Sequence, residues 1–141
     1  MTGPVAGEAG SVGTVLYALA AWTVFVWTTR ISNILEDSAA TGASRALDLA
    51  VAGTLAVLGL AVAVVAWRGG RPLGPVPVGV VLALVVATVA VWGVRTPPIL
   101  ADPDHGVGFK AVHAALALVS VALAGGAWWT VRRRRSVPSR A

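Results

Sequence analysis

The sequence predicts an all-α membrane protein with four transmembrane helices, built as two tandem helical hairpins that form a four-helix bundle. Three observations support this fold class. The composition is strongly apolar, the few charges leave four long uncharged stretches, and a fifteen-residue segment is repeated later in the chain. The first two observations place the helices in a bilayer, and the third relates one half of the chain to the other.

The composition is that of a membrane protein. Of 141 residues, 57% are apolar and 12% are charged, and the mean hydropathy is +0.80. A soluble domain carries about 25% charged residues. The chain contains no cysteine, which excludes disulfides, thiolate metal sites and thiol redox chemistry.

Four uncharged stretches predict the spans. They separate Glu8 from Arg30, Asp48 from Arg68, Arg71 from Arg95, and Lys110 from Arg132. Each has about the 20 residues needed to cross a hydrocarbon core roughly 30 Å thick. No stretch has a polar face at helical spacing, which argues against a soluble bundle. We expect spans near 12–30, 47–67, 77–95 and 110–131 in one domain, 12–131, flanked by an N-terminal segment, 1–11, and a basic tail, 132–141.

The positive-inside rule predicts the topology. Seven basic residues fall on one side: Arg68, Arg71, Arg132, Arg133, Arg134, Arg135 and Arg140. The other side has Arg30, Arg45, Arg95 and Lys110 among the acidic residues. We therefore expect both termini on the cytoplasmic side of the membrane. The basic tail is interpreted as a topology determinant, so nucleic acid is not expected as a partner, and the segment before the first span lacks the basic residues of a signal peptide.

A repeated segment indicates an internal duplication. "TVFVWTTRISNILED" (23–37) and "TVAVWGVRTPPILAD" (88–102) agree at eight of fifteen positions, 65 residues apart. The same offset places Arg45 on Lys110 and Asp48 on His113. Two hairpins of this kind have parallel orientation, so we expect pseudo-two-fold symmetry about the membrane normal. The alternative is chance similarity between two Ala/Val/Leu-rich segments.

Trp and Arg recur together at the ends of the first and third spans. Trp27 and Arg30, like Trp92 and Arg95, are three residues apart, so each pair shares a helix face. Trp prefers the membrane interface, and Arg can stack over its ring. We therefore expect interface anchors at Trp27, Trp92, Trp128 and Trp129.

The third helix is expected to stop near Arg95, because Pro97 and Pro98 follow it. The first helix has no such block, and if it continues, Arg30, Asn33 and Asp37 share one stripe. Two interpretations are open. The arginines are snorkelling anchors that fix helix depth, or they belong to a polar site between the repeats that is open to the outside.

Asp48 and His113 occupy equivalent positions just inside their spans. An ionisable residue there usually faces the bundle and is a functional candidate. We expect Asp48 and His113 to meet near the bundle axis, close to Arg30 and Arg95, with a cationic neighbour for Asp48. The cluster is either a structural polar plug that docks the hairpins, or a proton-responsive or ligand-binding site.

No catalytic or cofactor signature is present. The sequence lacks a Ser/His/Asp set, a glycine-rich phosphate loop and a metal-spaced cluster, so we predict no catalytic residues, no metal and no cofactor. His105 and His113 are poorly spaced to clamp one haem. No span has a carboxylate at its middle, which argues against a small proton-coupled exporter.

The W-x-x-R-x-x-N pattern and the segment "GFKAVHAALAL" resemble those of uncharacterised small four-helix integral membrane proteins of high-GC, actinobacterial-type bacteria. The resemblance covers about residues 14–131 and implies the fold but no activity. The repeat then marks as polar positions Arg30, Asn33, Asp37, Arg95, Asp102 and His113. Pro98 stands where the first repeat has Asn33, so a symmetric ligand site is not expected.

The expected function is that of a non-enzymatic integral membrane protein of the bacterial plasma (inner) membrane. It would be an accessory subunit or a self-associating scaffold with an Arg/Asp/His cluster at the extracellular end of the bundle. Its partners would be the lipid bilayer and another membrane protein or further copies of itself. The alternative is a small transporter or ligand-binding membrane protein that uses this cluster, and a third possibility is a membrane enzyme or haem carrier.

Overall fold

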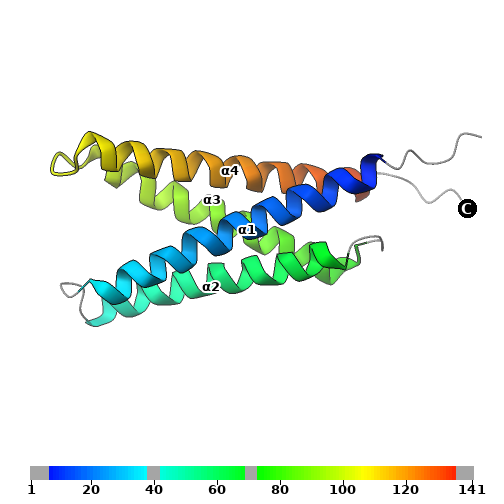
Figure 1. Ribbon diagram of the computed structural model, residues 1–141, viewed down its shortest axis with the longest axis horizontal. Coiled ribbons are helices and arrows are strands. Elements are labelled where there is room, and N and C mark those ends of the chain that lie inside the picture. The colour runs from blue at the N-terminus through cyan, green and yellow to red at the C-terminus, as the bar shows by residue number, and fades with distance from the viewer. Residues whose placement is uncertain (1–6, 38–41, 69–72, 136–141) are drawn as a thin grey trace, which may run out of the picture.

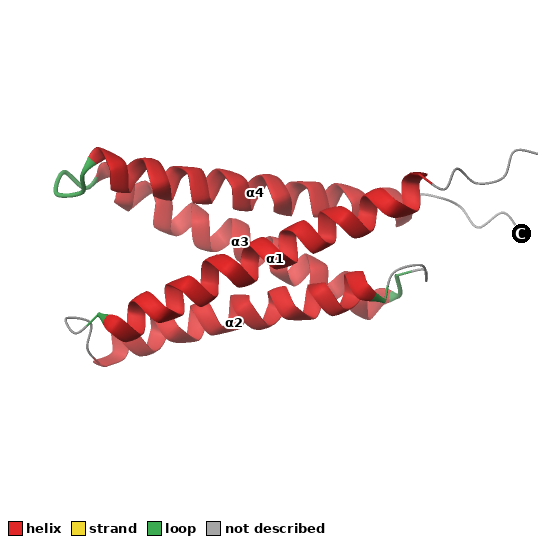
Figure 2. Cartoon of the chain, viewed as in Figure 1, coloured by secondary structure: helices red, strands yellow, loops and turns green. Residues whose placement is uncertain are grey.

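The described part of the chain consists of four long helices and their connections. The computed structural model describes residues 7–37, 42–68 and 73–135, with no strand among them (Figures 1 and 2). The helices are α1 (Gly7–Glu36), α2 (Gly42–Trp67), α3 (Pro75–Ala101) and α4 (Val107–Arg135). All four are long and apolar enough to cross a membrane. This confirms the predicted fold class of an all-α, four-helix membrane bundle.

The helices form a ring in which each packs against two neighbours. Helix α1 contacts α2 and α4, and α3 contacts the same two helices, so α1 and α3 face each other across the bundle. The last turns of α1 and α3 and the first turns of α2 and α4 all lie at the left of Figure 1, the α1–α2 hairpin below and the α3–α4 hairpin above. We call this the hairpin end, and the opposite end, where α1 begins and α4 ends, the terminal end.

The helices are longer than the sequence predicted, and the predicted end of the third helix is wrong. Helix α3 continues through Pro97 and Pro98 to Ala101. The two prolines remove backbone donors only in the last turns, where freed carbonyls lie near the membrane surface and can be hydrated. The helix stops at Asp102, whose extended backbone still donates its N–H to the Pro98 carbonyl at 3.0 Å. Helix α1 does continue past Arg30, as far as Glu36.

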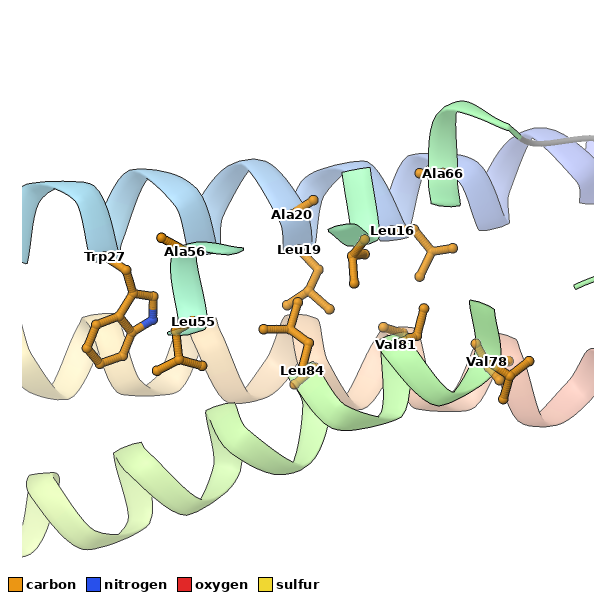
Figure 3. Packing of buried hydrophobic residues seen from close by; sticks show 14 of the residues in the cluster. Leu16, Leu19, Ala20, Trp27, Leu55, Ala56, Ala66, Val78, Val81 and Leu84 are labelled. Carbon is orange, nitrogen blue, oxygen red and sulfur yellow. The ribbon is translucent and has the colours of Figure 1, made fainter. Parts of the chain in front are cut away.

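One apolar core runs along the bundle between α1 and α3. Leu19 and Leu84 are fully buried and point toward each other in Figure 3. They belong to one cluster that also contains Leu16, Leu55 and Val81. Burial of apolar surface from water stabilises a protein by about 25 cal/mol per Å². Lipid tails are as apolar as these side chains, so inside a bilayer this core stabilises the bundle through close packing.

Buried positions follow the same 65-residue offset as the sequence repeat. On α1 and α3 the equivalent buried pairs are Leu16/Val81, Leu19/Leu84, Thr23/Thr88 and Trp27/Trp92. On α2 and α4 they are Ala52/Ala117, Leu55/Ser120, Gly59/Ala124, Val62/Ala127 and Ala66/Val131. The two hairpins therefore bury matching faces, although the duplication itself stays a prediction.

Small residues allow α1 to approach its neighbours closely. A Cβ added at Gly59 of α2 would lie 3.1 Å from the Val24 side chain and 3.2 Å from the Thr23 side chain. At Gly126 of α4 it would lie 3.5 Å from Val15. These contacts hold α1 between α2 and α4, and the Gly126 contact lies toward the terminal end.

Candidate functional site

Two arginines from opposite helices share one carboxylate near the hairpin end. Arg95 of α3 donates a hydrogen bond to Asp48 Oδ1 of α2. A terminal nitrogen of Arg30, on α1, lies 3.7 Å from Asp48 Oδ2. The expectation that Asp48 has a cationic neighbour is confirmed, and it has two. These three side chains, each from a different helix, are 30–40% exposed, so the cluster is half-buried.

This cluster carries more positive than negative charge. Two guanidinium groups face a single carboxylate, and each guanidinium has five N–H donors. The Arg30 Nε atom is buried, and no acceptor contacts it within the described residues. An unsatisfied donor of this kind costs about 1–3 kcal/mol. The arrangement therefore favours an additional acceptor with negative charge.

The tryptophans that precede Arg30 and Arg95 by three residues are buried within the bundle and not exposed to lipid. Trp27 and Trp92 are 5% and 7% exposed, and their ring centroids lie 6.3 Å apart at 49°. The prediction that both are interface anchors is therefore wrong, because their own contact across the bundle removes them from lipid. Trp128 and Trp129 are 41% and 55% exposed, and Arg133 lies over the Trp129 ring.

His113 does not meet Asp48, so that expectation is also wrong. Its Nδ1–H donates to the Phe109 carbonyl one turn earlier, at 2.9 Å. Its ring contacts the Phe109 ring, which in turn stacks on His105, with centroid distances of 4.0 and 4.4 Å. The local i, i+4 spacing within α4 competes successfully with the long-range partner, and the result is an aromatic column of His105, Phe109 and His113.

The α3–α4 loop is ordered by Asp102. The Asp104 backbone N–H donates to Asp102 Oδ1 at 2.9 Å, and His105 Nδ1 lies 2.9 Å from Asp102 Oδ2. The Asp104 hydrogen bond, and then the charge of His105, lower the pKa of the Asp102 carboxyl. Asp102 thus positions His105 at the start of the aromatic column.

A pocket of about 490 Å³ connects the arginines with this column. Its lining comes from α1, α3, α4 and the α3–α4 loop. The polar lining residues are Thr29, Arg30, Asn33, Arg95, His105 and His113. The apolar ones are Phe25, Val26, Trp27, Trp92, Ile99, Phe109, Val112 and Leu116. The volume is within the range of small-molecule sites, about 300–1,000 Å³.

The pocket unites some of the predicted polar residues and leaves others out. Arg30, Asn33, Arg95 and His113 line it, whereas Asp37, Asp48 and Asp102 do not. Asp48 contacts the arginines from outside the lining. Sequence reasoning missed Phe25, Phe109 and Val112, because an apolar residue in an apolar span carries no signal until its neighbours are known.

The comparisons with known proteins give no relative for this chain. No protein-family model, no curated protein and no solved structure matches it. Within the described residues, no group of three or more His, Cys, Asp or Glu side chains could hold a metal ion. The geometry and charge of the pocket are therefore the basis for proposing a function.

Proposed function

We propose that this protein is a non-enzymatic integral membrane protein that binds an anionic ligand in the pocket at the hairpin end of its bundle. The observation that carries the proposal is the sharing of Asp48 by Arg30 and Arg95. Both arginines line the pocket, while the carboxylate does not. The pocket therefore has two cationic groups at one end, and its described lining contains no Asp or Glu.

Arginine is suited to this role because its planar guanidinium binds phosphate or carboxylate through two parallel N–H donors. Asp48 holds Arg95 by a hydrogen bond and keeps Arg30 nearby. Such an arrangement fixes both side chains before a ligand arrives and lowers the entropy cost of binding. Asp48 is then a positioning residue, and the arginines make the ligand contacts.

The location of the site follows from the predicted topology. If both termini are cytoplasmic, the hairpin end faces the outside of the cell. The pocket would then take up its ligand from the outer leaflet or the extracellular solution. Binding alone is proposed, because binding is what the paired arginines and the pocket beside them support.

A second candidate function, an accessory subunit or scaffold, is supported by the exposure of α4. In the most apolar 18-residue stretch of α4, only 11% is buried within the bundle, against 28–33% in those of the other three helices. A helix with so little cover offers a surface for another membrane protein or a further copy of this chain. Co-purification in a mild detergent, followed by cross-linking, would detect such a partner through α4.

Thermal unfolding in detergent with added inorganic phosphate tests the proposed anion site. We expect phosphate, at ionic strength matched with chloride, to raise the melting temperature saturably. Arg30→Gln should abolish this rise, because it removes the cation with a spare donor. Arg45→Gln is the matched control, since Arg45 lies at the same end but donates to the Leu35 carbonyl outside the pocket.

The proposal is wrong if phosphate has no saturable effect beyond that of chloride, or if Arg45→Gln reduces the effect as much as Arg30→Gln does. Should Arg30→Gln fail to fold, Arg30→Lys takes its place. It keeps the charge but loses the paired donors, and it should weaken phosphate binding without removing it.

A further inference from the structure

On the side of the terminal end, the pocket is bounded by direct contacts between α1 and α4. Toward the terminal end these helices are in contact, where Gly126 faces Val15. Nearer the hairpin end, Trp22 Nε1–H donates to Ser120 Oγ at 2.9 Å, and the Ser120 hydroxyl donates to the Leu116 carbonyl. The pocket lining begins directly beyond this hydrogen bond, at Phe25 and Leu116. In Figure 1, α1 and α4 diverge toward the hairpin end.

The residues on the two sides of this opening are exposed on the outside of the bundle. Phe25 of α1 is 60% exposed, and on α4 Phe109 and Val112 are 44% and 58% exposed. All three also line the pocket. In a membrane, the surroundings of such side chains on a spanning helix are acyl chains. The pocket therefore opens sideways into the bilayer between α1 and α4.

Polarity changes along the depth of the pocket. On α1 the lining runs from Phe25 through Arg30 to Asn33, a rise of about 12 Å at 1.5 Å per residue. The deep end is apolar on α1 and α4, whereas the end near the loops contains the two arginines, Asn33 and His105. This gradient has the same direction as the one from acyl chain to headgroup in a bilayer leaflet.

Resting on the proposed anion site, we propose that the ligand is a phospholipid of net negative charge taken sideways from the surrounding leaflet. Its phosphate would bind Arg30 and Arg95, and its glycerol would lie beside Trp27 and Trp92. The acyl chains would leave past Phe25 and Val112 into the bilayer. A volume of about 490 Å³ suits a headgroup with its glycerol, while the tails stay in the membrane.

A soluble anion would use only half of this site. The guanidinium groups account for the binding of a phosphate, but the apolar deep end and its sideways opening would then serve no purpose for recognition. Net negative charge matters because the cluster has an excess of one positive charge after Arg30, Arg95 and Asp48 are paired. A zwitterionic lipid brings its own cation, which that excess would repel.

Native mass spectrometry of the full chain in mild detergent tests the inference with three probes. These are phosphatidylglycerol, phosphatidylcholine and glycerol phosphate, which has the anionic group without the tails. We expect phosphatidylglycerol to bind roughly tenfold more tightly than either of the others, because repulsion of the choline cation and loss of the acyl-chain contacts at the opening are each worth about that factor. Arg30→Gln should weaken phosphatidylglycerol binding roughly tenfold or more.

Substitutions at the opening separate the lipid from a soluble anion. Phe25→Ala should weaken phosphatidylglycerol binding several-fold and leave glycerol phosphate binding unchanged. Leu60→Ala is the matched control, because Leu60 is 55% exposed on α2, which contributes nothing to the pocket. Equal binding of glycerol phosphate and phosphatidylglycerol, with no effect of Phe25→Ala, would overturn this inference while the anion site stands. If phosphatidylcholine bound as tightly as phosphatidylglycerol, the requirement for net negative charge would be wrong. If Arg30→Gln left phosphatidylglycerol binding unchanged, both proposals would be wrong.

Discussion

Asp48 illustrates how a single residue near the start of a spanning helix organises the site. It lies between Arg30 and Arg95, which come from helices on opposite sides of the ring. We expect Asp48→Ala to lower the free energy of unfolding by about 1–3 kcal/mol, because it leaves two guanidinium groups without their counter-charge. This is less than the 3–5 kcal/mol of a fully buried pair, since the Asp48 side chain is 35% exposed. Thermal unfolding in detergent measures the change.

Double substitutions identify which partner of Asp48 matters. Asp48→Ala and Arg95→Ala should be strongly non-additive, because their side chains are hydrogen-bonded. The stability effects of Asp48→Ala and His113→Ala should add within about 0.5 kcal/mol, because His113 bonds to its own helix. An unchanged stability of Asp48→Ala would contradict this account of the cluster, as would strong coupling between Asp48 and His113.

The sequence predicted some residue positions better than others. A partly inserted carboxylate needs a cation, and this physical requirement was sufficient to predict the partner of Asp48. Trp27 and His113 could not be predicted in the same way. Trp has two suitable environments, the interface and a core contact with another Trp, and only the relative placement of α1 and α3 decides between them. For His113, a backbone carbonyl in the same helix was available at lower entropy cost.

Gly59 marks the closest approach of two elements, α1 and α2. A larger side chain there would collide with Val24 and Thr23. We expect Gly59→Leu to destabilise the protein by about 1–3 kcal/mol through overpacking. Gly53→Leu is the matched control on the same helix, because an added Cβ there meets nothing within 4 Å. Thermal unfolding of both variants in detergent measures the difference. A Gly59→Leu variant more stable than Gly53→Leu would contradict the close α1–α2 packing.

At the scale of elements, the number and order of the helices were predictable, whereas their ends were not. Uncharged stretches of about 20 residues are required by the thickness of a bilayer, so the four spans follow directly. The ends depend on what satisfies the terminal backbone groups. Pro97 and Pro98 lie in the last turns of α3, where water can replace the two lost hydrogen bonds, and α3 continues to Ala101.

The orientation of the whole molecule is a separate prediction from the distribution of basic residues. A reporter fused after Ala141 should be active only in the cytoplasm, and one inserted near Thr41 only outside. The physical reason is the retention of the Lys- and Arg-rich side in the cytoplasm. The opposite pattern would place the pocket in the inner leaflet and reverse the side from which its ligand comes. Both reporter positions fall outside the described residues.

The predicted internal two-fold relation would bring equivalent residues into contact across the bundle. Trp27 meets Trp92, and residues on a two-fold axis must meet their own equivalents. In an experimental structure, we expect residues 14–66 to superpose on 79–131, with Trp27 over Trp92 and Arg30 over Arg95. If the helices superposed only in another register, the repeat would be a chance similarity between segments of similar composition. The site breaks this symmetry, because Asp48 on α2 corresponds to His113 on α4.

The most direct test of the central claim is to locate a bound anionic lipid on the chain. A phosphatidylglycerol analogue with a photoreactive group in its acyl chain, close to the head, would be cross-linked to the protein in membranes and mapped by peptide mass spectrometry. We predict labelling of residues 25–33 on α1 and 109–116 on α4, with loss of that labelling in Arg30→Gln and its retention in Arg45→Gln. Labelling spread over lipid-facing positions such as Leu60 and Leu118, and unchanged by Arg30→Gln, would contradict the account.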